Sequence, residues 1–203
     1  MFDLPKHTEL HKLIPKKKIY EHFAAEMKPL RRKSFDADIA RITIVHELSP
    51  QSINLAAGKE IAAIFIVQLQ LRRENFDTKN IEIIARLFGQ KLLFVLTYEE
   101  ESCLAIYQTH LLLGEWQRTE NLSLELQGLD FDAVWQSIVL QIGEIQLQGG
   151  NTLDEQILLN EAKEKLKKQI DQLGQKAWKE IQPRKKFALV QEIHKLERQL
   201  EEM

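Results

Sequence analysis

The sequence of 203 residues holds one cysteine, Cys103, and its charges nearly cancel. A single cysteine excludes an internal disulfide bond and a cysteine-based zinc site, and it favours a reducing compartment. The formal net charge is −2 at pH 7. A basic coat for nucleic acid over the whole surface is therefore excluded, and any basic patch must be local.

Long apolar runs and targeting signals are also missing. No apolar stretch approaches the roughly 20 residues that span a bilayer. The opening MFDLPKHTEL lacks a basic start followed by an apolar run, so we expect no signal peptide and a cytoplasmic location. AAGKE at 56–60 contains Gly-Lys without the spacing of a phosphate-binding loop, and a strand-like segment follows it. We therefore interpret it as an ordinary loop and expect no cofactor.

The apolar residues that are present alternate as in a mixed α/β core. Residues 39–48, 60–72 and 91–101 have the pattern of strands, and residues 17–28, 77–90 and 129–145 that of helices, the first of them ended by Pro29. The strand–helix–strand order from 61 to 98 predicts a right-handed crossover between parallel strands. We predict an α+β (α/β) domain over 1–148, built on a mixed β-sheet with a βαβ crossover.

QGGN at 148–151 marks a boundary, and the composition changes after it. Over 152–203 leucine and isoleucine recur at spacings of three and four among many charges, which predicts a charged helical hairpin or coiled-coil arm. Its apolar stripe is narrow and needs a cover: the other half of the arm, the core domain or another chain, including a second copy. The candidate partner-binding residues are Leu166, Ile170, Leu173, Trp178, Leu196 and Leu200.

The order of elements over residues 15–98 resembles the core of restriction-endonuclease-like nucleases, given one further strand between 48 and 61. Those nucleases hold a metal with carboxylates on neighbouring strands, and a lysine helps to activate water. The corresponding positions here are Glu47, Glu60, Gln70 and Arg72. Arginine cannot act as a base and glutamine has no charge to hold a metal. The resemblance therefore implies a degenerate, non-catalytic relative, with a metal-dependent nuclease as the alternative.

Histidines and acids elsewhere make only partial metal sets. His7 and His11 are four residues apart, as on one face of a helix, and Asp36 and Asp38 form an acidic pair. Neither pair has the further ligands that a metal site needs, so we expect no metal. Cys103 lies in an apolar strand without a cationic neighbour in sequence, and we expect a buried, inert thiol.

Local basic clusters are the main candidates for nucleic-acid contact. IPKKKIYEHF at 14–23 is followed by RRK at 31–33, and PRKK begins the last predicted helix. Cations that met phosphates would give a salt-dependent affinity for DNA. A solvated helix face explains the same residues, so DNA contact stays open. The candidate residues are Lys16, Lys17, Lys18, Arg31, Arg32, Lys33, Arg184, Lys185 and Lys186.

Four segments of the chain together resemble an uncharacterised bacterial domain-of-unknown-function family. They are the opening MFDLPKHTELHKLIPKKKIYEHF, the strand IFIVQLQLR, the helix GLDFDAVWQSIVLQI and the charged tail. Members often end that strand in a Glu-Leu-Lys-like triplet, where this chain has Gln70-Leu71-Arg72. Their genes commonly lie beside those of Swi/Snf-type helicases and DNA methyltransferases in phage-defence or restriction islands. The resemblance implies a non-catalytic accessory subunit of such a complex, with a helicase or methyltransferase as its protein partner.

Overall fold

The structure is a computed structural model that describes residue 2 and residues 4–203. The chain divides after Gln146 into two compact units, and each is described by itself. Among the described residues, no helix is both long and apolar enough to span a membrane.

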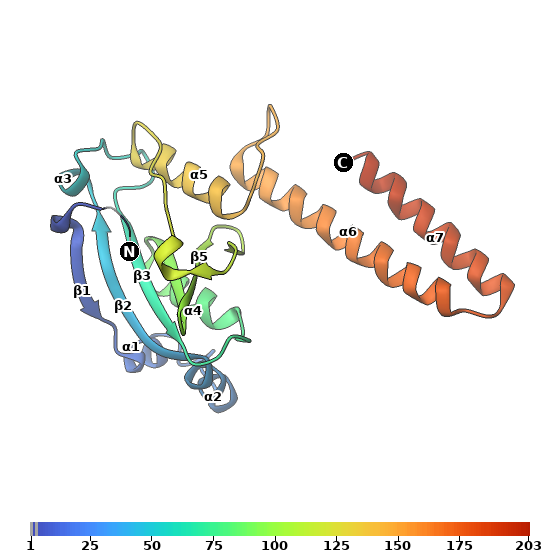
Figure 1. The fold of residues 1–203 in the computed structure, drawn as a ribbon, viewed down its shortest axis with the longest axis horizontal. Coiled ribbons are helices and arrows are strands. Elements are labelled where there is room, and N and C mark those ends of the chain that lie inside the picture. The colour runs from blue at the N-terminus through green and yellow to red at the C-terminus, as the bar shows by residue number, and fades with distance from the viewer. Residues whose placement is uncertain (1, 3) are drawn as a thin grey trace. The chain divides into compact units, whose positions relative to one another are not determined.

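The first unit is built on a mixed sheet (Figure 1), which confirms the predicted fold class. Its strands lie side by side in chain order, and only the pair β3–β4 is parallel. The strands are β1 (Glu9–Leu13), β2 (Ile39–Leu48), β3 (Ile64–Leu71), β4 (Lys91–Tyr98), β5 (Glu101–Tyr107), β6 (Leu111–Leu113) and the short β7 (Gln117–Arg118), which pairs with β5.

The predicted crossover is confirmed, because α4 (Lys79–Phe88) joins the parallel strands β3 and β4. The C-cap of α4 is Gly89, whose φ of 58° is the left-handed conformation that glycine adopts without strain. The apolar side chains of α4 point into the sheet, as its amphipathic pattern requires.

Two helices stand where the sequence predicted one. α1 (Lys16–His22) ends early, and Pro29 begins α2 (Pro29–Asp38) instead of ending a helix. Proline suits the first helical position because the N–H that it lacks has no helical partner there. Met27 is buried in the turn between them, so tertiary packing, and not helix propensity, decides the path of this segment.

The strand expected between 48 and 61 is not there; that segment holds the short helix α3 (Pro50–Ile53). β1, which comes before α1, takes the place of the missing strand at the edge of the sheet. The first unit also contains the 3-10 turns η1 (Lys6–Thr8) and η2 (Thr119–Asn121) and the helix α5 (Phe131–Ile142). The order of elements thus differs at its start from the nuclease-like order.

The sheet has a layer on each face. One face, called the helix face, forms a buried cluster with α1, α2 and α4, to which Ile19, Phe35 and Ile84 contribute. On the other face α5 packs on β5 and β6. We call it the α5 face. Trp135 of α5 is buried, and its indole Nε1 donates to Oε1 of Gln108 at 2.8 Å.

β1 forms one edge of the sheet, and each of its five residues is exposed. It pairs with β2 on one side, and its register is broken between Glu9 and Lys12. His11 lies inside this bulge with a φ of 49°, which is uncommon for a residue other than glycine.

The second unit is the predicted helical hairpin, drawn in orange and red in Figure 1. α6 (Leu153–Lys179) packs against α7 (Pro183–Glu201). α6 starts with a capping box, in which the hydroxyl of Thr152 accepts from the backbone of Glu155 while the Glu155 carboxylate accepts from Thr152. This signal fixes the start of α6.

Candidate functional site

A polar groove crosses the part of the α5 face that lies toward β1. It has a volume of about 620 Å³ and is lined by side chains from four adjacent strands. Its residues are Phe2, Glu9, His11, Arg41, Thr43, Val45, His46, Gln68, Gln70, Thr97, Glu99 and Thr119. We call it the sheet groove. Of the residues in the sheet groove, the sequence analysis named Gln70 as a candidate but missed Arg41 and Gln68. Both alternate with isoleucine or leucine along their strands, and this pattern could have placed them on one face of the sheet.

Of the four nuclease candidates, only Gln70 lines the sheet groove. Glu60 lines a different pocket, beside Lys91 at the start of β4. Gln70 lies near the end of β3, about 20 Å from the start of that strand at the usual rise of about 3.3 Å per residue. Arg72 follows β3, and its charge helps to lower the pKa of Asp36. The structure therefore does not bring the four side chains together.

Glu47 is turned away by a β-bulge. The sequence pattern put Glu47 on the same face as Arg41 and Thr43, but the pairing with β3 shifts register between Ile44 and His46. Beyond that shift Glu47 is opposite Phe65, which packs on the helix-face cluster. One extra residue in a strand moves every later side chain to the other face.

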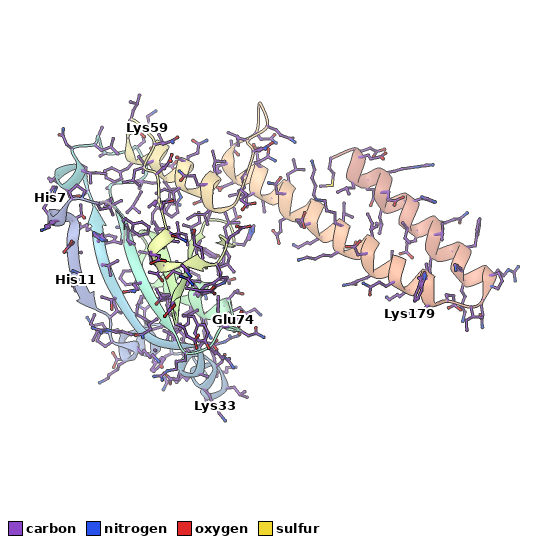
Figure 2. The ribbon with its side chains drawn as sticks, viewed as in Figure 1. His7, His11, Lys33, Lys59, Glu74 and Lys179 are labelled. Atoms are coloured by element: carbon purple, nitrogen blue, oxygen red, sulfur yellow. The ribbon has the colours of Figure 1, made fainter. Side chains whose placement is uncertain are left out.

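The predicted partial metal sets do not assemble either. His7 Nε2 contacts the carbonyl of Ser52, and His11 pairs with Glu9 at 3.3 Å, so the two histidines do not share a helix face (Figure 2). Within the described residues, no three His, Cys, Asp or Glu side chains form a group that could hold a metal ion.

Asp36 and Asp38 belong to separate networks. Asp36 accepts hydrogen bonds from Lys16 at 2.9 Å and from the Tyr20 hydroxyl at 2.6 Å. Burial pushes the pKa of Asp36 upward, but these two bonds outweigh it and leave that pKa below its usual value. Asp38 is fully buried and contacts Arg73 and Asn80 instead.

Asp38 is the centre of a buried polar network. Its carboxylate accepts hydrogen bonds from the guanidinium of Arg73, from the backbone N–H of Asp77 at 2.9 Å and from Nδ2 of Asn80 at 2.7 Å. It lies at the end of α2, so the network ties α2 to the segment between β3 and α4. We interpret it as structural, because its acceptor atoms are already occupied.

Several of the predicted DNA-binding cations are committed to contacts inside the unit. Lys16 bonds to Asp36 and to the carbonyl of Ile39, and its side chain is only 20 % exposed. Arg31 pairs with Asp77 at 2.5 Å. These two side chains hold α1 and α2 in place and are poorly available to phosphates.

The other cations of the first cluster lie on the surface. Lys17 forms a long pair of 3.7 Å with Glu21, and the guanidinium carbon of Arg32 lies 5.1 Å from the centre of the Tyr20 ring. Lys18 and Lys33 are exposed, and Lys33 projects from α2 in Figure 2. The first basic cluster is therefore smaller than its sequence indicates.

The backbone of the Gly-Lys loop binds a carboxylate of the protein itself. The carboxylate of Asp132, in the first turn of α5, accepts from the backbone N–H groups of Lys59, Glu60 and Ile61 at 2.6, 3.3 and 2.9 Å. Desolvation raises the pKa of Asp132, but these backbone bonds outweigh it and lower that pKa. A Cβ on Gly58 would lie 2.1 Å from Oδ1 of Asp132, so glycine is required there.

Cys103 is a buried thiol. It belongs to the helix-face cluster, and burial raises its pKa to about 12. Because the thiolate is the reactive form, Cys103 is chemically inert in the folded protein. It therefore contributes to the core and to no site.

In the arm, the predicted partner-binding residues fall into two sets. Five of them lie in the apolar stripe of the hairpin and are half-buried, and they are Leu166, Ile170, Leu173, Leu196 and Leu200. The sixth, Trp178, is 81 % exposed. The contact between α6 and α7 thus covers the stripe partly, while Trp178 has no such cover.

The hairpin turn carries further exposed apolar groups close to Trp178 in sequence. Ile181 is 92 % exposed and Phe187 is 64 % exposed. The same twelve-residue stretch, 176–187, carries one acidic residue, Glu180, and five cations, which are Lys176, Lys179, Arg184, Lys185 and Lys186. We call residues 176–187 the arm tip. Lys179 marks it in Figure 2.

Comparison with known proteins gives a family. No curated protein and no solved structure is similar enough to this chain to count as a match. A family model described as "Domain of unknown function (DUF4391)" matches residues 2–200, which is nearly the whole chain. The chain belongs to the DUF4391 family.

Proposed function

We propose that this protein is a non-catalytic accessory subunit of a bacterial anti-phage or restriction complex, and that it docks through its arm tip on a helicase or DNA methyltransferase subunit. The genomic setting comes from the family resemblance and is an argument by association. The observation that carries the proposal is the exposure of Trp178, Ile181 and Phe187 within the ten residues that join the end of α6 to the start of α7.

Exposed apolar side chains that cluster are typical of interaction sites, whereas scattered ones are not. Trp178 and Phe187 are large aromatic anchors, and aromatic residues are enriched among the residues that dominate binding energy. The surrounding cations exceed the acids by four. The surface that fits the arm tip is thus an apolar groove with acidic residues at its rim, on a protein partner.

The half-exposed stripe of the hairpin supports the same function. A two-helix hairpin covers only one side of each apolar stripe, so a partner helix could complete it. Self-association through the arm would satisfy the same groups, and the test below separates it from docking on another subunit.

Nothing in the geometry favours the nuclease alternative. Glu47 lies on the opposite face of the sheet from Gln70, and Glu60 lies at the other end of β3. We therefore do not propose it.

The test is co-purification of the tagged full-length protein with the products of its neighbouring helicase and methyltransferase genes. We expect a stable complex that the triple variant W178A/I181A/F187A loses, because truncating one aromatic anchor costs about 2 kcal/mol or more, roughly thirtyfold in affinity. Leu129→Ala is the matched control, since Leu129 is 91 % exposed in the other unit.

Two results would contradict the proposal. One is a protein that stays alone and monomeric at micromolar concentration in the presence of those subunits. The other is a triple variant that co-purifies as well as the wild type. Light scattering on the isolated protein decides whether the arm tip instead joins two copies of this chain.

A further inference from the structure

The α5 face of β3 changes character halfway along the strand. Ile64 and Ile66 are fully buried on this face. The next two side chains on it, Gln68 and Gln70, are half-buried and exposed, and both line the sheet groove. On the helix face the same strand stays apolar throughout. The polar half of the strand is thus confined to one face and one end, which favours a ligand site over a random loss of core.

The polar side chains of the sheet groove lie in register across three strands. Arg41 of β2 is opposite Gln70, and Gln70 is opposite Thr97 of β4. Thr43 is opposite Gln68 one step along. Neighbouring strands are about 4.8 Å apart, and alternate residues of one strand are about 7 Å apart. These donors and acceptors therefore cover an area about as large as one nucleotide.

Arg41, Gln68 and Gln70 have no hydrogen bond or ion pair to any other side chain among the described residues. The carboxylate of the buried Asp38, by contrast, is fully engaged by its neighbours. Arg41 and Gln70 are exposed and Gln68 is half-buried, so these groups bond to water in the free protein. A ligand can replace that water, and the fork-shaped guanidinium of Arg41 suits a phosphate or carboxylate.

The charges of the sheet groove define the ligand. Arg41 is the cation among its described lining residues, and it lies in the central row. Glu9 lies in β1 at the edge of the sheet, where it pairs with His11, and Glu99 follows β4 in the turn to β5. This arrangement suits a ligand with one anionic group in the middle and hydrogen-bond donors at its periphery. A long polyanion lying across the groove would meet the carboxylates.

We propose that the sheet groove binds a single phosphorylated nucleotide unit, with its phosphate on Arg41, its base or sugar against Gln68 and Gln70, and its hydroxyl or amino donors on Glu9 and Glu99. The unit is either a free nucleotide or one exposed nucleotide of a nucleic-acid strand. The proposed function supplies the strand as a source, but the site itself does not depend on docking through the arm tip.

The test is titration of the full-length protein with AMP, with adenosine and with a short single-stranded DNA. We expect no binding of adenosine, because it lacks the phosphate. Arg41→Gln should weaken phosphate-bearing ligands about tenfold or more, the usual effect of losing a charge-assisted hydrogen bond. Gln70→Glu keeps the side-chain size but sets a carboxylate beside the phosphate, and we expect it to abolish binding.

Arg72→Gln is the matched control, because Arg72 is a neighbouring cation that does not line the groove. Equal binding of AMP and the DNA supports a free nucleotide, and binding of the DNA alone supports a strand. For the single-stranded DNA, a total salt slope of about 0.7 would indicate that one phosphate is neutralised. The proposal fails if neither ligand binds, or if Arg41→Gln and Arg72→Gln weaken binding equally. Because the groove variants keep an intact arm tip, they should still co-purify with partner subunits.

Discussion

Removing the carboxylate of Asp38 tests how the first unit is held together. Asp38→Ala leaves Nδ2 of Asn80 and the N–H of Asp77 without their acceptor. An unsatisfied buried donor costs about 1–3 kcal/mol. Arg73 is half-exposed and can turn to water, so its release adds little. We expect Asp38→Ala to lower the free energy of unfolding by about 3 kcal/mol, at the lower end of the range of about 3–5 kcal/mol for breaking a buried ion pair.

Urea unfolding and thermal melting measure this loss. For a chain of this size, about 3 kcal/mol lowers the melting temperature by roughly 6–12 °C. Asp38→Asn should cost less, because Asp77 and Asn80 both donate to Oδ2 and one amide oxygen can replace it. The amide NH2 would then face only the half-exposed Arg73. Glu21→Gln is the control, since Glu21 makes only an exposed pair that is worth less than about 1 kcal/mol. A melting temperature for Asp38→Ala within about 2 °C of the control would refute the reasoning.

Three further predictions concern single contacts. Gly58→Ala should destabilise the unit by about 1–3 kcal/mol, the usual cost of overpacking, as thermal melts will show. Part of this cost should remain in an Asp132→Ala background, because the added Cβ would still lie 2.7 Å from the backbone nitrogen of residue 132. Partial burial raises the pKa of Asp77, but hydrogen bonds from Arg31 and the Lys79 backbone hold that pKa below its usual value. The unfolded state therefore binds the proton more tightly than the folded state does. The stabilisation that the ionised Asp77 contributes is full above about pH 4 and is lost as pH falls through the folded pKa. The difference in urea midpoint between wild type and Asp77→Asn should shrink over the same pH range. Cys103 should resist thiol reagents in the folded protein and react in urea, and rapid labelling under native conditions would show that its strand opens easily.

The sequence predicted the crossover and the arm because these depend on local patterns. It missed β1 because that strand is exposed along its whole length and has no alternation to read. It also misplaced Glu47, because the bulge before it is set by pairing with β3 and not by the residues of β2. The face of the sheet on which each residue after the bulge lies is decided by the pairing of β2 with β3.

For the candidate sites, too, the sequence shows local patterns but not the contacts between distant residues. Cationic sequence runs gave a list of possible DNA contacts, but the acids that neutralise Lys16 and Arg31 come from positions 36 and 77. Such distant partners cannot be seen in a linear run of lysines. Trp178 stood out as an aromatic residue in a charged helix, whereas the exposure of Ile181 and Phe187 close to it in sequence is known only from the structure.

The bulge in β1 bears on how copies of this protein can meet. An exposed edge strand offers unpaired backbone groups to any other extended chain. The left-handed residue at His11 interrupts this row, so a second sheet could not extend β1 with a continuous ladder. The bulge therefore opposes edge-to-edge polymerisation of this protein through β1.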